Sequence, residues 1–110
     1  MMNYKVAVEK MSLNIKVEFS GGSEFLVDGK KVHQMTFNEG SLLRDVLKEV
    51  AEKLVTDKAR MNLLFNADVT EVANGVITLI NDCDTALLSE YDTPLEDGDT
   101  VTFVSTLHGG

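Results

Sequence analysis

Residues 41–55 constrain the fold most, because apolar side chains recur there with the period of an α-helix. These apolar positions are Leu42, Leu43, Val46, Leu47, Val50, Ala51, Leu54 and Val55. Ser41 precedes them and is a favourable N-cap residue, while Asp45 places negative charge in the early turns. We therefore predict one main helix that begins at Ser41 and covers a sheet with its apolar face.

The segments around this helix have the patterns of β-strands. Residues 13–19 alternate strictly between apolar and polar, and 32–37 follow after a short link, which predicts an antiparallel pair. Residues 76–80 are almost continuously apolar, which predicts a strand with much of both faces covered. Residues 86–88 are assigned to a short strand, and the β-branched residues 100–106 to a central one. Together these elements predict an α+β domain with a sheet of four to five strands and one main helix packed across one face; the resemblance described below implies that the sheet is mixed.

The 110 residues suffice for one domain, which we divide into three parts. Residues 1–11 are an N-terminal extension for which a flexible conformation is one interpretation. Residues 12–106 form the domain body, and 107–110 form a reactive tail. The patterns in 57–75 are too weak to predict a conformation, and residues 63–65 fit either a short helical turn or a hydrophobic plug.

Composition narrows the classes of protein that the chain fits. Its net charge of −8 disfavours direct nucleic-acid binding, which depends on neutralising phosphates, and suits basic partners. No apolar run approaches the ~18 residues of a membrane span, and the first residues lack the pattern of a secretory signal. A single cysteine, Cys83, fits a reducing compartment. We expect a cytoplasmic monomer that does not enter membranes.

Two side chains are candidates for reactive or metal-binding groups. His33 shares a strand face with Met35, and no other ligand sits at metal-binding spacing, so a partly buried structural histidine is favoured. Cys83 lies between Asp82 and Asp84, whose charges disfavour a reactive thiolate. We therefore predict no metal site, no bound cofactor and no catalytic residues within the chain itself.

The end of the sequence suggests where the chemistry takes place. The last residues are Ser105-Thr106-Leu107-His108-Gly109-Gly110. Without Cβ atoms, two glycines can lie extended in a channel too narrow for other residues. The terminal carboxylate of Gly110 would then reach a partner's active site. A glycine pair alone is a weak signal, and a ragged end explains it equally well.

Four motifs, taken in order, resemble those of the ubiquitin-related modifier family, the eukaryotic sulfur carriers at the root of the ubiquitin-like proteins. They are Val17-Glu18-Phe19-Ser20-Gly21-Gly22, Leu79-Ile80-Asn81-Asp82, Leu95-Glu96-Asp97-Gly98-Asp99 and the six final residues. The resemblance covers about 13–110, and it implies a β-grasp fold with the first and last strands parallel at the sheet centre. The chain departs from the family in the extension before Met11 and in residues 62–74.

The resemblance also implies what the terminus does. A separate, ubiquitin-activating-like enzyme with a rhodanese-like domain would use ATP to adenylate the Gly110 carboxylate, and a sulfur donor would convert it to a thiocarboxylate. That sulfur would serve the 2-thiolation of wobble uridine in cytosolic tRNAs by tRNA thiolation enzymes. The same terminus would be joined to lysines of target proteins through an isopeptide bond. Thr106, Leu107, His108 and Gly109 would form the tail that partners bind.

Two other interpretations stay open. The first is a sulfur carrier similar to the small subunit of molybdopterin synthase, which shares the fold, the Asp-Gly-Asp turn and the Gly-Gly end. The Thr-Leu-His before the glycines disfavours it. The second is a ubiquitin-like interaction module with an idle terminus, which a chain ending at Gly110 disfavours.

Overall fold

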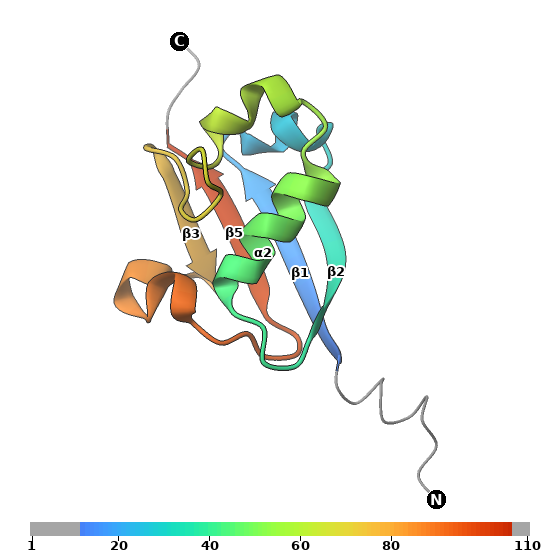
Figure 1. Ribbon diagram of the computed structural model, residues 1–110, viewed down its shortest axis with the longest axis vertical. Coiled ribbons are helices and arrows are strands. Elements are labelled where there is room, and N and C mark those ends of the chain that lie inside the picture. Colours follow the sequence, from blue (N-terminus) through green and yellow to red (C-terminus); the bar gives the residue numbers. More distant parts are fainter. Residues whose placement is uncertain (1–11, 107–110) are drawn as a thin grey trace, which may run out of the picture.

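The computed structural model describes residues 12–106, which form a five-stranded mixed sheet with a helix across one face (Figure 1). The strands are β1 (Ser12–Ser20), β2 (Val32–Asn38), β3 (Val76–Ile80), β4 (Cys83–Asp84) and β5 (Thr100–Ser105). Their order is β2-β1-β5-β3-β4, and β1 runs parallel to β5 at the centre while the other neighbours are antiparallel. The predicted α+β fold, including the parallel central pair, is confirmed.

The alternation in the sequence decides which face of the sheet is covered. In β1 every second side chain is buried, namely Leu13, Ile15, Val17 and Phe19. The residues between them point to the opposite face, because successive side chains of a strand alternate. In β5 the middle residues Val101, Thr102 and Phe103 are all buried, as expected for a strand with neighbours on both sides.

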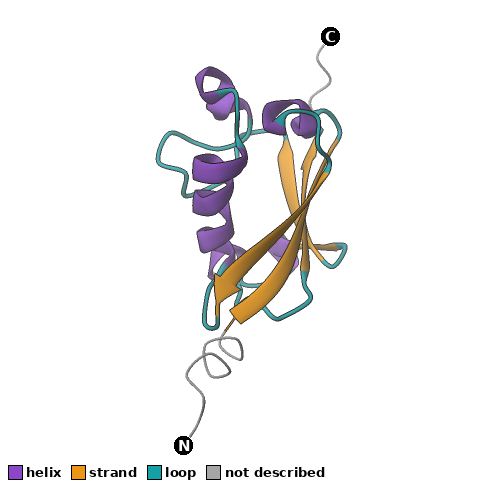
Figure 2. Ribbon diagram, turned by 90° about the vertical axis from the view of Figure 1, so that its right-hand side faces the viewer, coloured by secondary structure: helices purple, strands orange, loops and turns teal. Residues whose placement is uncertain are grey.

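One continuous helical segment covers the inner face of the sheet (Figure 2). It consists of α2 (Leu43–Glu49) and a wider π-helical end, η2 (Val50–Leu54). The prediction that Ser41 caps it is wrong, because the N-cap residue is Leu42. Leu42 has no polar side chain, so the carboxylate of Asp45 accepts the hydrogen bond from the Leu42 N–H at 2.7 Å. The helix start is therefore capped from inside its first turn.

The exposed side of the helix carries an ion pair between two residues four positions apart. The Lys53 ammonium lies 2.9 Å from the Glu49 carboxylate, one helical turn away. The hydrogen bond to Glu49 raises the pKa of Lys53 above its usual value. Both groups are close to solvent, so the pair fixes side-chain direction more than it stabilises the fold.

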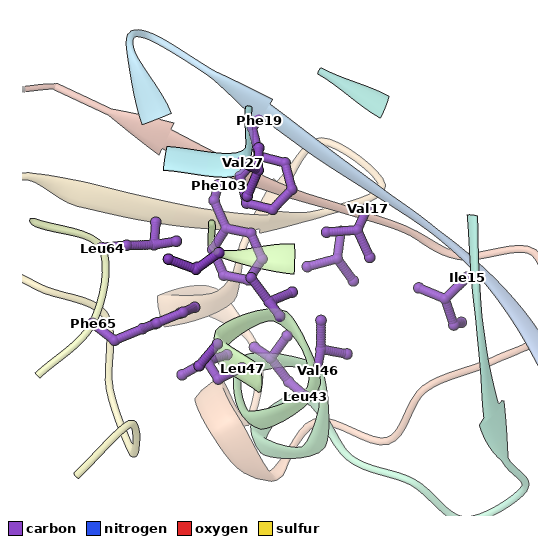
Figure 3. Close-up of a cluster of buried hydrophobic side chains, with 14 of the residues drawn as sticks. Ile15, Val17, Phe19, Val27, Leu43, Val46, Leu47, Leu64, Phe65 and Phe103 are labelled. Carbon is purple, nitrogen blue, oxygen red and sulfur yellow. The ribbon is translucent and has the colours of Figure 1, made fainter. Parts of the chain in front are cut away.

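The core lies between the helix and the sheet and is centred on three aromatic rings (Figure 3). Phe103 stacks on Phe19 with ring centroids 5.6 Å apart and meets the edge of Phe65 at 5.8 Å. Phe65 and its neighbour Leu64 are fully buried, although they belong to the segment that the sequence left undefined. Both interpretations of residues 63–65 hold in part, because Leu63 ends the 3-10 helix η3 (Lys58–Leu63) and is 46% exposed, whereas Leu64 and Phe65 are buried in the core.

Two strand predictions beyond residue 75 are wrong in part. Strand β3 is not covered on both faces, because Ile77 is 39% exposed on the outer face. Residues 86–88 do not form a strand, since the chain enters the 3-10 turns η4 (Thr85–Leu87) and η5 (Glu90–Asp92). The Asp84 carboxylate accepts a hydrogen bond from the Ala86 N–H at 2.9 Å, which turns the chain away from the sheet.

The remaining short element is the 3-10 helix η1 (Ser23–Val27), which follows β1 directly. Within residues 12–106, no helix has the length and apolar character that crossing a bilayer requires. The division into 1–11, 12–106 and 107–110 stays a prediction, since its first and last parts lie outside the described residues.

Candidate functional site

The candidate site begins where β5 ends, because the predicted reactive tail continues from that strand. Leu107, His108, Gly109 and Gly110 lie outside the described residues, and their predicted roles stay predictions. Thr106 is described and exposed. The geometry around Thr106 therefore defines how the chain leaves the sheet.

Thr106 is held on one side by the loop that leads into β3. Its N–H donates to the carbonyl oxygen of Gly75 at 2.6 Å, and its hydroxyl approaches the same oxygen at 2.7 Å. The main-chain bond continues the antiparallel ladder between β3 and β5 by one residue, and the hydroxyl adds a second tether. Two bonds to one carbonyl fix the direction of the chain at the last described residue.

On the other side, the turn after β1 packs closely against the end of β5. Gly21 has a φ of +69°, and a Cβ atom built there would lie 2.2 Å from the carbonyl oxygen of Ser105. Only glycine allows this approach, since that distance is far inside van der Waals contact and the φ disfavours other residues. The main chain of the turn therefore packs directly against the main chain at the end of β5.

The side chain of Ser23 also joins this turn to β5 by hydrogen bonds. Its hydroxyl is almost fully buried and lies 2.8 Å from the carbonyl oxygen of Phe103 and 2.9 Å from that of Ser20. The single hydroxyl proton is shared between these two acceptors, one on each of the paired strands. Figure 1 shows β1 and β3 flanking β5 as it runs toward the carboxyl end. The last strand is thus held from both sides.

The two candidate reactive side chains, His33 and Cys83, lie on the two edge strands of the sheet, β2 and β4. In β2, the Nε2–H of His33 donates to the Lys30 carbonyl at 2.7 Å, and its ring meets the edge of Phe19. His33 is partly buried, as predicted. Cys83 belongs to β4 at the opposite edge of the sheet, where its thiol lies 3.8 Å from the Asp84 carbonyl oxygen. Over residues 12–106, no group of three metal-ligating side chains is placed to hold an ion.

An apolar strip lies on the outer face of the sheet next to this end of β5. Ile77 of β3 pairs with Val104 of β5, and both side chains are at least partly exposed. Leu79 continues the strip along β3 and is half-buried. This strip is therefore an exposed apolar surface next to the last residues of β5.

Sequence reasoning missed three residues that shape this site, namely Gly21, Ser23 and Gly75. Gly21 belongs to a motif quoted for the family resemblance, but the sequence does not give the register that places the turn after β1 against β5. Gly75 lies in the segment for which the sequence predicts no conformation, and nothing in the sequence indicates that its carbonyl oxygen accepts hydrogen bonds from Thr106. These contacts depend on strand order, which local patterns do not encode.

Comparison with known proteins gives a consistent result. The sequence model of the family described as Urm1 (Ubiquitin related modifier) matches residues 14–110. The ubiquitin-related modifier 1 homolog of Caenorhabditis elegans is 59% identical over 99 residues, covering 90% of this chain and 98% of the relative. Human ubiquitin-related modifier 1 is 43% identical over 101 residues, covering 89% and 96%. The solution structure of Urm1 from Trypanosoma brucei superposes with a TM-score of 0.75 at 32% identity, covering 90% of this chain and 97% of that one.

Proposed function

The chain belongs to the ubiquitin-related modifier family, and we propose that it is a sulfur carrier and protein modifier that reacts through the carboxylate of Gly110. One observation carries the proposal: the family match extends to residue 110 and so includes the whole Leu-His-Gly-Gly tail. Membership in this family means that the chain is a ubiquitin-like modifier protein, which is a carrier rather than a catalyst. The specific reactions below are our inference from this position of the glycines.

The carboxylate must be activated before it can react, because oxide is a poor leaving group. In the proposed first step, a carboxylate oxygen of Gly110 attacks the α-phosphorus of ATP, and pyrophosphate leaves. The terminal sulfur of a cysteine persulfide then attacks the acyl adenylate, and AMP leaves. The product is an acyl disulfide between Gly110 and the donor cysteine. A second thiol attacks the Sγ atom of that cysteine and forms a disulfide with it. The bond between the two sulfurs breaks, and the thiocarboxylate of Gly110 leaves. ATP and the sulfur donor belong to the activating enzyme, and no cofactor is assigned to this chain.

The body of the domain holds the strand from which the reacting tail leaves. Hydrogen bonds from Thr106 to Gly75 and the close approach of Gly21 to Ser105 hold the strand from which the tail leaves. A rigid base reduces the freedom lost when the terminus enters an active site. We assign recognition by the partner to Leu107 and His108, and access through a narrow channel to Gly109.

We infer that three kinds of partner meet this terminus in the cytoplasm. The first is an activating enzyme similar to that of ubiquitin, with a rhodanese-like domain that supplies sulfur. We place its docking on the outer face around Ile77 and Val104, which adjoins the base of the tail. The others are enzymes that thiolate wobble uridine in tRNA, and target proteins whose lysines form isopeptide bonds with Gly110. The net charge of −8 argues that tRNA is reached through those enzymes.

Reconstitution tests the proposal as a whole. We expect the chain, incubated with ATP, a ubiquitin-activating-like enzyme and a persulfide donor, to gain the mass difference between one sulfur and one oxygen. Addition of a tRNA thiolation enzyme and its tRNA should then yield 2-thiouridine and return the chain to its original mass. A chain that is never loaded and never conjugated to lysine would instead be an interaction module with an idle terminus.

A further inference from the structure

The sheet ends on one side at β2, and the outer edge of this strand is open. Among the described residues β2 pairs only with β1, and Figure 1 shows it as the last strand on the right-hand side of the sheet. The strand at the other edge, β4, is only two residues long. Residues 32–38 are therefore the long open edge of the described sheet.

The hydrogen-bond pattern shows which main-chain groups of β2 face this open edge. The Phe19 N–H donates to the Lys31 carbonyl oxygen at 2.8 Å, so these two residues are a hydrogen-bonded pair of the antiparallel ladder. Bonded and non-bonded pairs alternate in such a ladder, so every second residue after Lys31 also bonds to β1. The N–H and C=O groups of Val32, Gln34 and Thr36 then point away from the sheet, and no other main-chain group within residues 12–106 pairs with them.

This edge lacks the features that usually prevent edge strands from pairing with other chains. Proteins protect long edges with charged side chains, prolines, bulges or a covering segment. Residues 32–38 contain no lysine, arginine, acidic residue or proline, and their pairing with β1 is regular over seven residue pairs. Val32 at the start of the strand is 43% exposed. The edge is therefore suited to accept an added strand.

A groove of about 340 Å³ lies between the second half of β2 and the helical segment of α2 and η2. Thr36 lines it on the side of the strand, and its charged lining residues all come from the helical segment. The Asp45 carboxylate is held by the Leu42 N–H, and Glu49 is paired with Lys53.

Lys48 is the remaining charged residue that lines this groove. It is exposed and makes no ion pair among the described residues. Lys30 and Lys31, which directly precede β2, are also exposed and form no ion pair within residues 12–106. Glu39 follows β2 but does not line the groove. On a chain with a net charge of −8, unpaired lysines thus lie near both ends of this edge, which favours an acidic partner.

We propose that the open edge of β2 binds an extended segment of a partner protein, in which acidic residues flank a run of β-branched ones. The segment adds to the sheet as a sixth strand, held by main-chain bonds to Val32, Gln34 and Thr36. Lys31 and Lys48 attract its acidic residues from the two ends of the edge. Strand β1 separates this edge from β5, so binding here is compatible with reaction at the terminus. The proposal does not rest on the sulfur-carrier function.

Peptide titration followed by amide NMR tests this site on the full chain. The probe is an acetylated, amidated heptapeptide in which valines and threonines alternate between an aspartate at each end. One control peptide carries lysines in place of the aspartates, and the other is methylated on the main-chain nitrogens that would bond to β2. We expect saturable shifts at Val32, Gln34 and Thr36 with the probe, at least fivefold weaker binding of the lysine peptide, and none of the methylated one.

Three results of this titration would overturn the proposal. The first is equal binding of either control peptide. The second is the absence of shifts at Val32, Gln34 and Thr36 up to millimolar probe. The third is a shift of the same amides with protein concentration alone, which would assign the edge to a second copy of the chain.

Substitutions separate the main-chain bonds from the charge. Gln34→Pro removes an N–H that faces the open edge and no bond to β1, a position in which edge strands accept proline. We expect it to weaken the probe peptide roughly tenfold, whereas Gln34→Ala leaves the affinity unchanged. Lys48→Gln should weaken the peptide about threefold and reduce the salt dependence.

Arg44→Gln is the matched control for the charge, because it removes a positive charge from the same helix on the side where Arg44 pairs with Asp92 of η5. We expect it to leave the affinity unchanged. Unchanged affinity in Lys48→Gln, or in a Gln34→Pro chain that circular dichroism shows to be folded, would contradict the proposal.

Discussion

Deletion of Gly110 is expected to reduce adenylation of the terminus by about 100-fold or more, with almost no change in the melting temperature. Removing one residue shortens the extended tail by about 3.5 Å, and catalysis falls steeply when reacting groups are misplaced by even ~1 Å. Stability should be preserved because the core of the described residues is built from side chains between Leu13 and Phe103, and a terminal glycine has no side chain to bury. ATP–pyrophosphate exchange with the activating enzyme measures the first effect, and thermal unfolding measures the second.

Gly110→Ala is the matched control for this deletion, because it keeps the length of the tail and adds only one methyl group. We expect its exchange rate to fall between those of the deletion and the unmodified chain. A deletion that still reacts at the full rate would show that Gly110 is not the activated residue. A large loss of stability would show that the tail packs against the body.

Gly21→Ala is expected to destabilise the fold by about 2–4 kcal/mol, within the range reached when strain and a steric clash combine. The new Cβ would lie 2.2 Å from the carbonyl oxygen of Ser105, a backbone atom that cannot rotate away. The φ of +69° adds strain for any residue with a side chain. Urea unfolding followed by circular dichroism gives the free-energy difference.

The neighbouring glycine provides the control for this clash. Gly22 also has a positive φ, of +108°, but a Cβ atom there would meet nothing within 4 Å. Gly22→Ala should therefore show only the backbone strain, about 1 kcal/mol. Equal losses for the two variants would mean that the contact between Gly21 and Ser105 does not hold the end of β5.

The elements that the sequence predicted well are those whose pattern is local. The alternation in β1 and the helical period of α2 each reflect which side of one element meets the core, so they are visible without knowing the neighbours. The parallel pairing of β1 with β5 was different, because it came from resemblance to a family rather than from periodicity. The sequence leaves two interpretations open for residues 63–65, because Leu64 and Phe65 enter the core without belonging to a strand or long helix whose periodicity would mark them.

The errors arise where a tertiary contact outweighs a local preference. Ser41 is a better N-cap residue than Leu42, yet the helix begins after Leu42 because Asp45 can cap it from within. The run 76–80 is apolar on both faces, but only one face meets the core, which leaves Ile77 exposed. At the candidate site, Gly21 and Gly75 act through backbone contacts with β5, and no side chain marks those contacts in the sequence.

The most direct test of the account is to find where sulfur resides after loading. The loaded chain is digested, and the carboxyl-terminal and Cys83 peptides are analysed by mass spectrometry, with a Cys83→Ser chain treated in parallel. The account predicts that one sulfur replaces one oxygen on Gly110 and that Cys83→Ser loads to the same extent. Sulfur found on Cys83 as a persulfide, with Gly110 unchanged, would contradict it.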